Sequence, residues 1–148
     1  MTPVECPCGG ASPDKRPGSP APRFEDCCGR FLAGGEERPA NAMELMRSRY
    51  TAYVLGDTPY LRATWAVRTC PEDLDKSTDK SDDKSDGSAT RWLGLQIKRH
   101  AVLDQDHEEV EFVARYKVGG RAHRLHETSR FTRDNDGRWR YVDGDIHD

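Results

Sequence analysis

The pattern of apolar and polar residues predicts one principal helix, from Asn41 to Leu55. At about 100° per residue, one side of this helix carries apolar side chains, namely Ala42, Leu45, Met46, Ala52 and Tyr53. The opposite, solvent-facing side is expected to carry Arg47, Ser48 and Thr51. Asn41 is placed to cap the start of the helix together with Glu44, and Gly56 suits its end.

After position 90 the apolar period changes from helical to alternating, which predicts four strands: Arg91–Leu103, Glu109–Val118, Arg121–Arg133 and Arg138–Asp143. The sequences between them are short turns, so neighbouring strands are expected to be antiparallel. Before the strands, Thr58 and Pro59 begin a second, short helix that runs to Trp65. Two helices followed by an antiparallel meander predict an α+β fold with the helices on one face of the sheet. Alternation places Leu93, Leu95 and Ile97 on that face.

A charged residue interrupts the apolar side of the principal helix, because Arg49 lies between Leu45 and Tyr53. An unpaired buried charge is costly, so Arg49 must pair with a carboxylate or line a polar cavity. Strand alternation puts two carboxylates, Glu127 and Asp143, on the sheet face that packs against the helices. The sequence therefore predicts that the side chains of Arg49 and Glu127 meet, with Asp143 as the substitute partner.

Two interpretations of this pairing stay open. In the first, an ion pair between Arg49 and Glu127 seats the helix on the sheet and binds nothing. In the second, the space between helix and sheet is a small pocket in which Arg49 holds an anionic or carbonyl group. A buried Glu127 or Asp143 would then be a candidate general base. The predicted pocket residues are Arg49, Tyr50, Tyr53, Trp65, Glu127, Tyr141 and Asp143.

The N-terminal segment contains four cysteines in two close pairs, Cys6 with Cys8 and Cys27 with Cys28. The loop between the pairs is rich in Pro, Gly and Ser and cannot build a core of its own. Four thiolates at about 2.3 Å satisfy a tetrahedral Zn²⁺ ion and would tie this loop to one point. Disulfides are the alternative, but a reducing compartment disfavours them, and a bridge between adjacent residues would be strained. We expect one Zn²⁺ ion per chain at Cys6, Cys8, Cys27 and Cys28, with Cys70 outside the site.

Composition and charge narrow the choice of partners. The 148 residues include no apolar run long enough to span a membrane and no basic-then-apolar start, so a cytoplasmic protein without a membrane partner is expected. The net charge of −3 is uneven, because the segment 71–90 is strongly acidic and the remainder is close to neutral. Bulk nucleic-acid binding is therefore not indicated. The acidic segment repeats a DKSx unit without apolar residues and is predicted to be a disordered insert, to which we assign no function.

The cysteine pairs occur as Cys6-Pro7-Cys8-Gly9 and Cys27-Cys28-Gly29, a pattern that resembles the SEC-C zinc motif, with a longer spacer than is usual. The segments 38–57, 92–95 and 120–143 further resemble the YchJ-like family of uncharacterised bacterial proteins. This resemblance implies a SEC-C zinc-binding segment at 1–37 and a nuclear transport factor 2-like domain at 38–148. In that fold a curved sheet wraps a long helix into a cone, and a small zinc knuckle precedes it.

Two classes of function follow from these observations. The first is a non-catalytic zinc-binding module whose knuckle docks on a protein or nucleic acid, which a closed four-cysteine site and the SEC-C resemblance favour. The second is a small-molecule binder, or a lyase or isomerase, that uses the cone pocket around Arg49 and Glu127. Ketosteroid isomerases and dehydratases resemble this fold, but fold alone does not establish an activity. A homodimer is compatible with either class.

The five histidines add no further site at this level. His126 lies in the most family-like stretch, and strand alternation points it outward beside Arg124 and Arg130. None of the five shows metal-ligand spacing with another histidine or with the cysteines.

Overall fold

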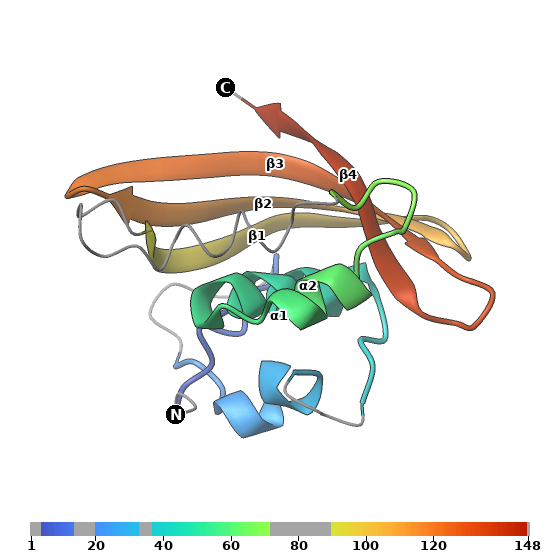
Figure 1. The fold of residues 1–148 in the computed structure, drawn as a ribbon, viewed down its shortest axis with the longest axis horizontal. Coiled ribbons are helices and arrows are strands. Elements are labelled where there is room, and N and C mark those ends of the chain that lie inside the picture. Colours follow the sequence, from blue (N-terminus) through green and yellow to red (C-terminus); the bar gives the residue numbers. More distant parts are fainter. Residues whose placement is uncertain (1–3, 14–19, 33–36, 72–89, 148) are drawn as a thin grey trace.

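The computed structural model describes residues 4–13, 20–32, 37–71 and 90–147, which form three layers. An antiparallel sheet lies on one side, two helices pack beneath it, and the cysteine-rich N-terminal segment covers the other side of the helices (Figure 1). The predicted disordered insert at 71–90 falls almost entirely outside the described residues. None of the described helices is long and apolar enough to cross a membrane.

The sheet contains four strands in sequential order, β1 (Thr90–Asp104), β2 (His107–Val118), β3 (Arg121–Arg133) and β4 (Trp139–His147). Each strand pairs antiparallel with the next, so the predicted α+β meander is confirmed. The main difference lies at the end of the chain. Strand β4 continues past its predicted end at Asp143 and pairs with β3 as far as His147.

A bulge in β1 changes which side chains face the helices. The register shifts between Trp92, which pairs with Tyr116, and Gly94, which pairs with Arg115. Because one extra residue reverses the alternation, Trp92 packs inward and Leu93 is 47% exposed. The predicted inward position of Leu93 is therefore wrong, whereas that of Ile97 is confirmed.

A second bulge corrects the prediction for Asp143. Phe131 pairs with Tyr141 and Arg130 pairs with Asp143, which leaves Val142 as the extra residue of β4. Asp143 is consequently exposed on the outer face, where its Oδ1 accepts a hydrogen bond of 2.6 Å from Arg130 Nε. It lines no pocket with Arg49, and its prediction as the substitute partner is wrong.

Helix α1 (Ala42–Leu55) begins and ends as its sequence predicts. The Asn41 side chain accepts a hydrogen bond of 2.9 Å from the backbone N–H of Glu44, and Gly56 closes the helix in the left-handed conformation at φ 75°. With 14 residues α1 is about 21 Å long, so the long helix of the expected cone is not confirmed, and the sheet stays open. Helix α2 (Thr58–Ala63) is capped by Asp57 instead of Thr58 and ends before Trp65.

Both sides of α1 are covered, which sequence periodicity does not show. Ser48 and Thr51 are fully buried, and the Thr51 hydroxyl lies 3.7 Å from the Cys6 sulfur. Arg47 donates a hydrogen bond of 3.0 Å from Nη1 to the backbone carbonyl of Ala11. The N-terminal segment therefore packs on the side of α1 that was expected to face solvent, and that expectation is wrong.

Candidate functional site

Four cysteine side chains meet behind α1, and each is 7% exposed or less. The Cys8 sulfur lies 3.4 Å from that of Cys6 and 3.5 Å from that of Cys27, and the sulfurs of Cys27 and Cys28 are 4.0 Å apart. Two thiolates bound to one tetrahedral ion at about 2.3 Å lie about 3.8 Å apart. All the cysteines are free thiols in this structure, and the cluster is compatible with a tetrahedral metal ion.

Backbone hydrogen bonds bring the two cysteine pairs together. The N–H of Cys6 donates to the Pro22 carbonyl at 2.9 Å, which sets the first pair beside the chain that leads to the second. Two 3₁₀ turns, Phe24–Asp26 and Cys28–Arg30, then turn Cys27 and Cys28 toward the first pair. In the second turn a Cβ on Gly29 would lie 2.7 Å from the Phe24 carbonyl oxygen, which explains the glycine after the second pair.

The pKa values of the crowded thiols are shifted in opposite directions. Hydrogen bonds with Cys27 and Cys28 lower the pKa of Cys6, and a hydrogen bond with Cys27 raises the pKa of Cys28. Four thiolates at these separations would repel one another unless a cation lay between them. The donor set and its spacing therefore fit a divalent metal ion.

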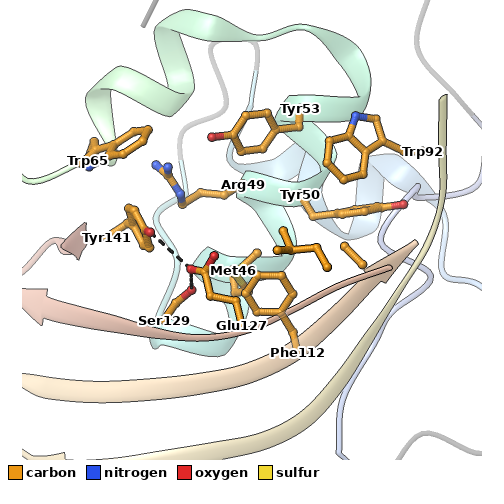
Figure 2. Close-up of a pocket in the computed structure, with 12 residues that line it drawn as sticks. Met46, Arg49, Tyr50, Tyr53, Trp65, Trp92, Phe112, Glu127, Ser129 and Tyr141 are labelled. Atoms are coloured by element: carbon orange, nitrogen blue, oxygen red, sulfur yellow. Dashed lines mark hydrogen bonds between the residues drawn. The ribbon is translucent and has the colours of Figure 1, made fainter. Parts of the chain in front are cut away.

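A pocket of about 140 Å³ lies on the opposite side of α1, between this helix and the sheet (Figure 2). Six of the seven predicted pocket residues line it, and Asp143 does not. The full lining is Met46, Arg49, Tyr50, Tyr53, Trp65, Trp92, Phe112, Ala114, Leu125, Glu127, Ser129 and Tyr141. The main omission from the prediction is Trp92, which the bulge turns inward. Gly94, inside a predicted strand, was the available signal for that bulge.

Arg49 is buried in this pocket, where its side chain donates hydrogen bonds to a backbone carbonyl and a hydroxyl. Its guanidinium lies 4.8 Å from the ring centre of Trp65 and 4.7 Å from that of Tyr141. Its Nη1 donates hydrogen bonds to the Leu61 carbonyl at 2.9 Å and to the Thr64 hydroxyl at 2.8 Å. Burial lowers the pKa of Arg49, and it forms no ion pair with any carboxylate in the described part of the chain. The predicted ion pair with Glu127 is therefore wrong.

Glu127 is instead held by hydroxyl groups of the sheet. Its Oε2 accepts a hydrogen bond of 2.6 Å from Ser129 Oγ and one of 3.3 Å from the Tyr141 hydroxyl (Figure 2). Burial, followed by the charge of Glu127, raises the pKa of Tyr141, which stays a neutral donor. The carboxylate lies against the backbone of Gly144, where an added Cβ would overlap Oε2. The pocket thus presents a cation and a carboxylate that do not neutralise each other by contact.

The fold and the buried cysteine cluster define a class: a nuclear transport factor 2-like domain with a SEC-C-like N-terminal segment. Residues 41–144 match the family model described as YchJ, middle NTF2-like domain. A UPF0225 protein of Ralstonia nicotianae is 53% identical over 95% of this chain and 90% of its own. A UPF0225 protein of Cupriavidus metallidurans is 49% identical over 99% of this chain and 92% of its own. The chain belongs to this YchJ-like, UPF0225 family of uncharacterised proteins.

Two solved structures share the fold. A SEC-C motif containing protein of Psychrobacter arcticus has a TM-score of 0.71 and 28% identity, and the match covers 97% of this chain and 83% of that one. A SEC-C motif containing protein of Rhodopseudomonas palustris has a TM-score of 0.61 and 34% identity, and the match covers 88% of this chain and 96% of that one. The expected family is confirmed, and the motif named for both structures agrees with the cysteine pattern of this chain.

Proposed function

We propose that this protein binds a small planar molecule in the pocket between α1 and the sheet, and that a Zn²⁺ ion at the four cysteines holds α1 in place. The observation that carries the proposal is the burial of Arg49, 3% exposed, without an ion pair to any carboxylate among the described residues. A buried charge with no carboxylate partner lowers stability, so its position at the wall of a pocket favours a role in binding. Stacking on Trp65 and Tyr141 and the two bonds from Nη1 fix its orientation before a ligand arrives.

The size and walls of the pocket favour a single ring. A cavity of about 150 Å³ with apolar walls accommodates one benzene molecule. This pocket has a similar volume and is lined by Trp92, Tyr50 and Phe112 among its apolar residues. Aromatic walls favour a flat ligand through offset or edge contacts.

The polar groups of the pocket indicate which substituents the ring of the ligand must carry. The guanidinium of Arg49 would hold an anionic or carbonyl oxygen, because it donates hydrogen bonds and accepts none. Glu127 already accepts from Ser129 and Tyr141 through Oε2, so it would accept a further hydrogen bond from a ligand hydroxyl or amine. The expected ligand class is therefore a one-ring compound with an acidic or carbonyl group and a separate hydrogen-bond donor.

The proposed Zn²⁺ ion has a structural role in this scheme. Four cysteine ligands leave it no open position for a substrate, and the cluster packs directly against Thr51 of α1. The same helix carries Arg49 on its other side. Docking of the knuckle on a protein or nucleic acid, and lyase or isomerase chemistry at Glu127, stay predictions that no observation of this structure favours further.

The experiment is a binding panel followed by protein NMR or calorimetry, with benzoate, phenol, 3-hydroxybenzoate and 4-hydroxybenzoate as probes. We expect a hydroxybenzoate to bind at least about tenfold more tightly than benzoate or phenol, because a hydrogen bond to a charged group contributes about 1.5–3 kcal/mol. Glu127→Gln should remove the advantage of the hydroxyl group. Failure of all four probes, or binding that is indifferent to Arg49 and Glu127, would contradict the proposal.

Replacing Gly144 by alanine tests the placement of Glu127. The new methyl group would overlap the Glu127 carboxylate, so this side chain must move while the backbone of β4 stays acceptable for alanine. We expect hydroxybenzoate affinity to fall to that of benzoate, with little change in the unfolding midpoint. Gly94→Ala is the matched control, since its Cβ meets nothing within 4 Å. Equal affinities of the two variants would show that Glu127 does not contact the ligand.

A further inference from the structure

Three potential metal ligands converge on the outer face of the sheet, away from the pocket. Glu111 comes from β2, His126 from β3 and His147 from β4. Glu111 precedes Phe112, and His126 precedes Glu127. Because Phe112 and Glu127 line the pocket, Glu111 and His126 point to the opposite side of the sheet.

The three side chains are already in contact. Nε2 of His126 lies 2.7 Å from the Glu111 carboxylate, and the ring centres of His126 and His147 are 4.4 Å apart. One potential ligand atom from each residue lies within 4.8 Å of the other two. Ligands of one tetrahedral ion with bonds of about 2.0–2.2 Å are about 3.4 Å apart, so small side-chain rotations would bring all three onto one ion.

Sheet register explains why the sequence conceals this cluster. His126 on β3 pairs directly with His147 on β4. On β2 the residue opposite His126 is Val113, so Glu111, two residues away, is the diagonal neighbour of His126. No short spacing along the chain marks such a set. Spacing along the chain gave no sign of this cluster, and the predicted β4 ended at Asp143, which left His147 without a strand partner.

We propose that Glu111, His126 and His147 form a second metal site, separate from the four cysteines, that binds a divalent first-row transition metal ion. Two imidazoles and one carboxylate are the donors that such ions prefer. The ion would replace the proton of the hydrogen bond between His126 Nε2 and the Glu111 carboxylate. Three ligands from one face of the sheet leave the outward positions open to water or to an anionic ligand.

The surroundings of the site support this arrangement. The Thr128 hydroxyl lies 2.7 Å from Nε2 of His147 and orients that ring. His126 and Glu111 are only 22% and 25% exposed, so both are held by neighbouring side chains while the site stays reachable from solvent. Arg99 approaches Glu111 at 3.9 Å, but its side chain is 58% exposed and can swing away.

The test uses Co²⁺ with the full chain loaded beforehand with one equivalent of Zn²⁺ and freed of excess metal, so that the second site is left unfilled. We expect equilibrium dialysis to find one additional equivalent of Co²⁺, without the thiolate-to-cobalt charge-transfer absorption that would indicate replacement of Zn²⁺ at the cysteines. Glu111→Gln and His147→Ala should each weaken this binding by at least about tenfold. Both positions are on the solvent side of the sheet, and circular dichroism would verify that each variant folds.

His107→Ala is the matched control. His107 also contacts a carboxylate, with Nδ1 2.8 Å from Asp104, but it belongs to no three-ligand cluster among the described residues. We expect it to bind Co²⁺ as the unaltered chain does. The proposal is overturned if no additional equivalent binds in excess Co²⁺, or if both cluster variants retain it.

Discussion

Replacing Cys28 by serine is expected to abolish tight Zn²⁺ binding and to lower the unfolding temperature more than any other single substitution considered for this chain. Cys28 is 1% exposed and belongs to a cluster that shares one apolar core with Leu45 and Ala52 of α1. Structural Zn²⁺ contributes about 10–16 kcal/mol in zinc-finger peptides, which is comparable to the total stability of a typical domain. Loss of one of four ligands should therefore release the N-terminal segment and uncover α1.

The measurement combines metal analysis of the purified protein with thermal unfolding followed by circular dichroism. Cys70→Ser is the control, because Cys70 is a half-buried free thiol outside the cluster. It should retain one equivalent of Zn²⁺ and its unfolding midpoint. A native, metal-free protein whose stability is unaffected by Cys28→Ser would rule out the structural role proposed for the ion.

The regular parts of the fold could be predicted because local physical chemistry determines them. Asn41 and Gly56 mark the ends of α1 through side-chain capping and a left-handed residue. The order of the four strands follows from their short turns. The errors in strand facing have one cause: bulges beside Gly94 and at Val142 add one residue each, and the extra residue reverses the alternation from one side of the bulge to the other.

The candidate sites could likewise be predicted only in part from the sequence. The four cysteines are evident in the sequence because the loop around them has too few apolar residues to form a core, so a metal ion is needed to fold it. Arg49 could be placed in the core by helical phase, but its partner could not. The sequence offers a carboxylate, whereas the structure satisfies Arg49 with the rings of Trp65 and Tyr141 and with a backbone carbonyl. Such contacts depend on the loop after α2, whose path no periodicity describes.

Arg49→Met is expected to leave the free energy of unfolding within about 1 kcal/mol of the unaltered chain while removing hydroxybenzoate binding. Methionine fills much of the same volume and removes the cost of a buried charge, which offsets the loss of two cation–π contacts of about 0.5–2 kcal/mol each. Of the two acceptors released by Arg49, the Thr64 hydroxyl keeps a partner. Thr64 Oγ1 lies 2.8 Å from the Tyr60 carbonyl and 3.3 Å from the Leu61 carbonyl, so its hydroxyl remains bonded.

Arg47→Met is the matched control on the same helix, and chemical denaturation with probe titration would compare the two. It loses the bond to Ala11 that ties the N-terminal segment to α1, so we expect it to cost about 0.5–1.5 kcal/mol and to bind the probe normally. Helical phase alone predicts the reverse order of stability. An Arg49→Met variant destabilised by about 3–5 kcal/mol would indicate a broken buried ion pair. A stable variant that has lost the probe would show that Arg49 serves binding and adds nothing to the stability of the fold.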